Sequence, residues 1–167
     1  MSVETPQLVR NPVISAKSCA PLLEAAMREV FQIMVGVRLV RARDINPPAV
    51  ADLTAMVGLA GQICAIVSLR CKATTARRVA AKMLGVESLE SNQLDEAAHD
   101  AIGEICNMVA GNFKAKVAGL IDGCMLSVPT VITGKDYHLH LVANGSRATV
   151  VFEFEGLPIW AALDMHI

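Results

Sequence analysis

Four residues between positions 100 and 111 have types and spacings that could support chemistry. They are Asp100, Glu104, Asn107 and Gly111, and they recur at intervals of four, three and four residues. In an α-helix this spacing places all four on one stripe along about three turns. A carboxylate can pair with lysine or arginine, and a carboxamide can both donate and accept hydrogen bonds. We therefore take this stripe as the candidate functional site.

Two residues of the stripe are unfavourable for a helix. A glycine such as Gly111 in a helix interior costs about 1 kcal/mol relative to alanine, and Asn107 is a poor helix former. A partner surface that approaches the backbone closely would explain the glycine, and a need for a neutral donor and acceptor would explain the asparagine. The alternative interpretation is a solvated helix face that happens to carry an asparagine.

A long amphipathic helix must position the stripe, and we predict it over residues 95–119. Its apolar side, which faces away from the stripe, consists of Ala98, Ile102, Ile105, Cys106, Val109 and Phe113. Ser91 or Asn92 in the preceding polar loop can cap its N-terminus. The helix therefore has one side to bury and one side to present.

Other periodic segments predict further elements around this helix. A first helix is predicted over 21–35, with Ser18 as N-cap and Gly36 as its end, and a short helix over 74–84 that ends at Gly85. The predicted strands are residues 37–45, a hairpin of 53–59 and 62–71, and then 124–132, 137–142, 147–155 and 159–167. Hairpin turns are predicted at Asn144 with Gly145 and at Gly156 with Pro158.

Length and composition predict one cytoplasmic globular domain. The chain has 167 residues, of which 53% are hydrophobic and 19% charged, and residues 1–18 read as an irregular arm before a single domain at 19–167. A net charge of −1 without a basic run argues against nucleic-acid or membrane partners. No segment has the pattern of a signal peptide or a membrane span. Five widely spaced cysteines suit reduced, buried thiols.

The first helix repeats part of the stripe. Glu29, Gln32 and Gly36 have the same spacing as Glu104, Asn107 and Gly111. Each helix is also followed by a predicted strand and a hairpin, so we predict an internal pseudo-repeat. Glutamine replaces the asparagine in the first copy, and Ala25 stands where Asp100 would correspond. We therefore expect one working face per chain.

Several other kinds of site are disfavoured. His138 and His140 alternate on one predicted strand, but no third metal ligand lies at a plausible spacing. Nucleophile motifs and glycine-rich phosphate loops are absent from the sequence. An asparagine cannot act as a general base, but it can hold a water in line with an electrophile that another molecule presents. Glu104 can meanwhile pair with a basic residue of that molecule.

These residues resemble the signature of the CheC, CheX and FliY phosphatases of bacterial chemotaxis, and most of all the single-site CheX type. That signature is an aspartate or serine, three residues, a glutamate, two residues, an asparagine and, after 21 more residues, a proline. Here Asp100, Glu104, Asn107 and Pro129 occupy these positions. The likeness extends from the first helix to the last strand.

The resemblance implies an α/β (α+β) fold in which long helices pack on an antiparallel sheet, and a homodimer. It implies that Asn107 positions the water that attacks the phosphoaspartate of a CheY-like response regulator, while Glu104 pairs with the regulator's lysine. The chain would need no cofactor of its own, because Mg²⁺ would belong to the regulator. Asp100 and Gly111 would contact the partner, and Pro129 would shape the strand that follows it.

Three rival interpretations stay open at this point. The same helix face could grip a response regulator without hydrolysing anything. The protein could be a structural or dimeric switch component, as FliY relatives suggest. It could also bind a small molecule on the sheet.

Overall fold

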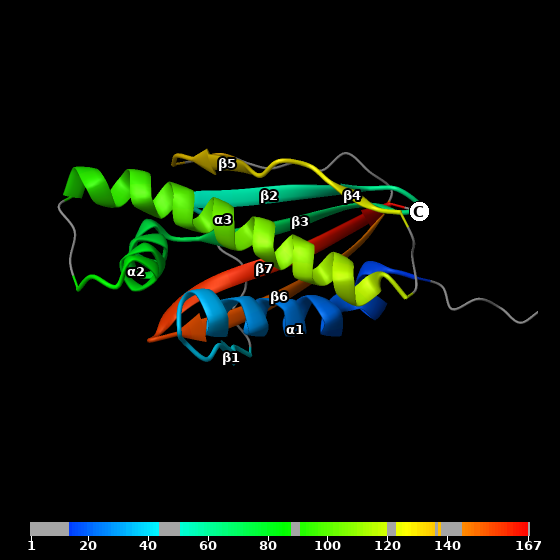
Figure 1. The fold of residues 1–167 in the computed structure, drawn as a ribbon, viewed down its shortest axis with the longest axis horizontal. Helices are drawn as coiled ribbons and strands as arrows, with labels where there is room; N and C mark the ends of the chain where they lie inside the picture. Colours follow the sequence, from blue (N-terminus) through cyan, green and yellow to red (C-terminus); the bar gives the residue numbers. More distant parts are fainter. Residues whose placement is uncertain are drawn as a thin grey trace, which may run out of the picture.

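The computed structural model describes residues 14–43, 51–87, 91–119, 123–135, 137 and 145–166, with side chains in the longest helix described from Asp95 onward. Three helices and seven strands lie in these ranges, and Figure 1 shows how they are arranged. In chain order they are α1 (Ala16–Met34), β1 (Val40–Arg41), β2 (Leu53–Ala60), β3 (Cys64–Cys71), α2 (Ala73–Leu84), α3 (Ser91–Val117), β4 (Met125–Leu126), β5 (Thr130–Thr133), β6 (Ser146–Phe154) and β7 (Leu157–His166). The predicted α+β class is confirmed.

One antiparallel sheet forms the base of the fold. Its strand order is β1-β6-β7-β3-β2-β4, and β5 also pairs with β2. The helices α1 and α3 lie across the sheet in front of the strands in Figure 1, and α2 packs beside α3. All three helices contribute to one hydrophobic core with the sheet. None of the described helices is long and apolar enough to cross a membrane.

The strand order confirms the predicted pseudo-repeat. Each half has a long helix, then an edge strand or strand pair, then a hairpin: α1, β1 and β2–β3 in the first, α3, β4 with β5 and β6–β7 in the second. The edge strand of each half pairs with the other half's hairpin, because β1 joins β6 while β4 and β5 join β2. The strands β3 and β7 join the halves at the centre.

Helix α1 begins earlier than predicted. Ser15, not Ser18, is its N-cap, and the two serines form a capping box in which each side chain accepts a hydrogen bond from the other's backbone N–H, at 3.2 and 2.9 Å. The N–H of Ala16 also donates to Ser146 Oγ at 2.7 Å. Residues 16–18, predicted as part of the arm, are therefore the first turn of α1, and Pro21 lies inside the helix. Residues 1–13 lie outside the described residues.

Several strand predictions also need correction. The strand predicted at 37–45 is only Val40–Arg41 among the described residues, and the one at 124–132 is interrupted at 127–129. The turn between β6 and β7 uses Glu155 and Gly156, both at positive φ, while Pro158 lies within β7. The turn residue Asn144 and the strand at 137–142, apart from Tyr137, lie outside the described residues.

The remaining elements match their predictions closely. The β2–β3 hairpin is present, and α2 ends at Gly85, which adopts the left-handed conformation that favours glycine at a helix end. Helix α3 starts four residues before the predicted position and buries every residue assigned to its apolar side.

A salt-bridge cluster fixes α2 to the β6–β7 turn and gives a pH-dependent prediction. Hydrogen bonds from Arg78 and then from Lys82 lower the pKa of Glu155 from 4.5 to about 2. A lowered carboxylate pKa stabilises the fold above the unfolded-state pKa, and this contribution is lost as pH falls from about 4.5 towards about 2. We expect Glu155→Gln to remove part of the acid dependence of the urea unfolding midpoint between these pH values.

The control is Glu153→Gln, which changes a glutamate on β6 that has no ion pair among the described residues. An unchanged acid profile in Glu155→Gln would contradict the assignment.

Candidate functional site

Helix α3 presents the predicted stripe on its open side. The side chain of Asp100 is 81% exposed, Glu104 is exposed, and Asn107 and Gly111 are half-buried. Ile105 and Val109, on the opposite side, are completely buried against the core. The structure therefore brings the four predicted residues together on one accessible face.

Glu104 and Asn107, the two central side chains of the stripe, make no polar contacts within the described part of the chain. Neither has a side-chain hydrogen bond or an ion pair to another described residue. Asp100 has only His99, whose Nδ1 lies 3.9 Å from Asp100 Oδ1. An isolated carboxylate and carboxamide on a helix surface give the fold little stability, so both groups are available to an external partner.

The strand segment at 126–131 runs along α3 beside Asn107. A Cβ atom on Gly103 would lie only 3.0 Å from Val131 Cγ2, and one on Gly111 would lie 3.9 Å from Leu126 Cδ1. These glycines are one turn before and one turn after Asn107, so the segment between Leu126 and Val131 passes this asparagine. The fold thus brings Pro129, 22 positions away in the sequence, to the same side of the site.

Ser127 fixes this segment to the sheet where the strand is interrupted. Its backbone N–H donates to the carbonyl of Gly58, and its Oγ accepts from the N–H of Gly58, both at 2.9 Å. The same hydroxyl donates to the carbonyl of Val128 at 2.9 Å. Pro129 follows and immediately precedes β5. Neither Ser127 nor Gly103 was identified from the sequence as part of the site, although a second glycine inside the helix was a visible signal for Gly103.

A groove borders the stripe on its other side. It lies between α2 and α3, has a volume of about 280 Å³, and is lined by Met83 and Leu84 of α2 together with Asp100, Ala101 and Glu104 of α3. The stripe therefore lies between α2 on one side and the 126–131 segment on the other.

The cysteines do not offer a nucleophile next to the stripe. All five are free, and only Cys64 is exposed. Burial raises the pKa of Cys106, on the core side of α3, and of Cys71 to about 12. A thiol with such a pKa stays protonated at neutral pH and is a poor nucleophile. Four of the five cysteines are buried as predicted, and Cys64 is the exception.

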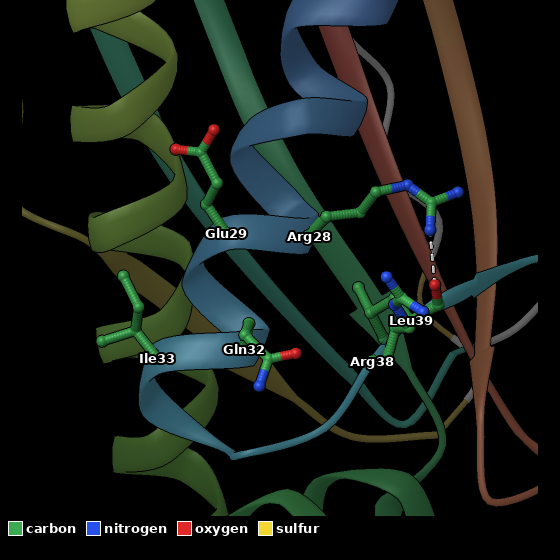
Figure 2. Close-up of a pocket in the computed structure, with 6 residues that line it drawn as sticks. All are labelled: Arg28, Glu29, Gln32, Ile33, Arg38 and Leu39. Atoms are coloured by element: carbon green, nitrogen blue, oxygen red, sulfur yellow. Dashed lines mark hydrogen bonds between the residues drawn. The ribbon is translucent and has the colours of Figure 1, made fainter.

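Figure 2 shows part of the corresponding face of α1, on which the glutamate is bound by other residues of the chain. Glu29 points towards α3, where its carboxylate accepts hydrogen bonds from Asn112 Nδ2 at 3.0 Å and Lys116 Nζ at 2.7 Å. The bond from Lys116, and then that from Asn112, lowers the pKa of Glu29. Gln32 is exposed beside a cavity of about 490 Å³, but Gly36 lies beyond the end of α1. Of the two related glutamates, only Glu104 has no partner among the described residues.

Comparison with known proteins identifies the family. The family described as chemotaxis phosphatase CheX matches residues 53–154, which include the whole stripe and Pro129. The CheY-P phosphatase CheX of Thermotoga maritima is 30% identical over 123 residues, covering 70% of this chain and 78% of that protein. The chain belongs to the CheX family.

Solved structures show the same fold. CheX from Vibrio vulnificus has a TM-score of 0.76 and 22% identity, over 89% of this chain and 99% of that one. The CheX-CheY-BeF3-Mg²⁺ complex from Borrelia burgdorferi gives a TM-score of 0.70 and 19% identity, over 89% and 97%. The fold of solved CheX structures therefore covers 89% of this chain, which is more than the residues 53–154 of the family match.

The two glycines beside Asn107 give a matched pair of stability predictions. Gly111→Ala adds a methyl group where 3.9 Å is available, so we expect the better helix propensity to raise the free energy of unfolding by about 1 kcal/mol. Gly103→Ala must displace Val131 from 3.0 Å, so that gain should be cancelled or reversed. Urea unfolding of both variants measures the difference. Equal stabilisation by both would contradict the close packing at Gly103.

Proposed function

We propose that this CheX protein hydrolyses the phosphoaspartate of a CheY-like response regulator, with Asn107 orienting the attacking water and Glu104 docking to the regulator's lysine. Membership of the CheX family supports phosphatase activity, and the Borrelia relative was solved with CheY. The observation that carries the two residue roles is that both side chains are exposed or half-exposed on one helix face, with no partner among the described residues.

The proposed chemistry needs positioning more than proton transfer. The water oxygen attacks phosphorus, the bond from phosphorus to the aspartyl oxygen breaks, and the products are the aspartate carboxylate and inorganic phosphate. The amide of Asn107 accepts a hydrogen bond from the water and holds it in line with the breaking bond. Mg²⁺ in the regulator would neutralise charge on the phosphoryl oxygens, so this chain supplies no metal.

Glu104 would fix the amide by anchoring the helix. Residues three apart on a helix have neighbouring side chains, so an ion pair between Glu104 and the regulator's lysine limits where Asn107 can lie. Glu29 could not do the same, because Asn112 and Lys116 already occupy its carboxylate. Asp100 would add a polar contact at the edge of the interface, and Gly111 would allow close approach of the regulator. The homodimer that the family resemblance implies stays a prediction.

The activity prediction separates the two roles. A purified CheY-like receiver from the same organism is phosphorylated, and its phosphate loss is followed with and without the protein. We expect Asn107→Ala to reduce the acceleration about 100-fold with little change in affinity, because the water is no longer held in line. Glu104→Gln should mainly weaken binding, because it removes the charge that pairs with lysine. Glu96→Gln, an exposed glutamate two turns earlier on α3, is the control.

The main rival is a module that binds the regulator without hydrolysis. It predicts that the native protein leaves the phosphate lifetime unchanged although binding still depends on Glu104. If Asn107→Ala accelerated phosphate loss as much as the native protein does, the protein would still be a phosphatase but the proposed role of Asn107 would be wrong.

A further inference from the structure

Val128 is an exposed apolar side chain that the fold itself does not use. It is 82% exposed, more than any other large hydrophobic residue in the described parts of the chain. An apolar side chain left in water contributes almost nothing to the stability of its own fold, because it removes little of its surface from solvent. Single exposed valines are common, so exposure alone does not indicate a binding role and the neighbouring residues must be considered.

The backbone around Val128 holds it in one position. Ser127 binds Gly58 through both its N–H and its Oγ, and the same hydroxyl donates to the carbonyl of Val128. Pro129 on the other side has a fixed φ and is followed directly by the paired strand β5. The backbone at Val128 is therefore already ordered in the folded protein, so binding a partner does not require this segment to lose further conformational entropy.

Val128 lies beside the stripe, and a second apolar side chain lies on the opposite side. The contacts of Gly103 with Val131 and of Gly111 with Leu126 place the intervening residues next to Asn107. Across the stripe, Leu84 at the end of α2 is 58% exposed and lines the groove that Glu104 and Asp100 also line. The polar groups of the site are thus bordered by an apolar residue on each side.

We propose that Val128 and Leu84 are the apolar contacts that seat the phosphorylated receiver domain on either side of Glu104 and Asn107. This inference rests on the proposed function, which identifies the receiver domain as the partner. Val128 and Leu84 border the helix face that carries Asn107, so a receiver bound to that face would also contact them. A lysine pairs with a carboxylate as a flexible point charge, so one ion pair cannot set the angle at which the amide enters. Apolar contacts on two sides set that angle and exclude bulk water from the ion pair.

The partner surface that fits has a defined chemistry. It carries a lysine and the phosphoryl group at its centre, with apolar side chains on both sides at the distance between α2 and the 126–131 segment. Receivers with charged side chains at these two places should bind poorly, so Val128 and Leu84 would also determine which regulators are accepted.

Binding is measured with the same receiver trapped by beryllofluoride and Mg²⁺, which requires no hydrolysis. We expect Val128→Ser and Leu84→Gln each to raise Kd about tenfold, with a matching rise in KM and little change in kcat. Val128→Ile, which keeps an apolar side chain, should bind like the native protein. Ile33→Ser is the matched control, because Ile33 is 74% exposed but lies on α1.

The outcomes distinguish this inference from the proposed function. Native Kd in both Val128→Ser and Leu84→Gln would overturn the inference even if the native protein hydrolyses phosphoaspartate. If these variants bind more weakly but the native protein does not hydrolyse phosphoaspartate, the docking surface is supported and the proposed phosphatase activity is rejected. A change of molecular mass in solution on Val128→Ser would overturn it in favour of contact between two copies of this chain.

Discussion

The close packing of the 126–131 segment on α3 is the contact on which the arrangement of the site depends. Val131 approaches Gly103 so closely that a methyl group would have to displace it. Because the side chains of Val131 and Leu126 pack directly against the glycines of α3, Asn107 lies near the border between the helix and this segment. This contact places the segment that carries Ser127 and Val128 next to the helix that carries the polar stripe.

The related glutamates of the two halves, Glu104 and Glu29, make different contacts. In the second half, Glu104 has no partner among the described residues and can reach outwards. In the first half, Glu29 binds Asn112 and Lys116, so it ties α1 to the C-terminal turns of α3. This ion pair and this hydrogen bond are exposed and contribute modestly to stability, but they set how the two helices lie against each other. The related glutamate thus supports the helix that carries the functional one.

The sequence predicted those features that depend on local spacing. The stripe of Asp100, Glu104 and Asn107 follows from helical periodicity alone, and Gly85 marks the end of α2 because few other residues adopt its conformation. The start of α1 was missed, because a serine capping box extends the helix before the apolar pattern begins. The break at Ser127 was missed because a side-chain hydrogen bond there replaces a backbone one. That the segment containing Pro129 packs on α3 between Gly103 and Gly111 depends on tertiary packing, which no local pattern contains.

The exchange of edge strands between the halves affects how the protein can fold. Since β1 pairs with β6, and β4 and β5 pair with β2, neither half can complete its sheet alone. These pairings join residues far apart in the chain. Closing such long loops lowers the conformational entropy of the chain before the strand contacts that stabilise the fold can form. The helix face that carries Asn107 comes from one half, while Gly58, which holds the neighbouring segment, comes from the other. A chain with only one half formed therefore has no complete site, so the site exists only in fully folded molecules.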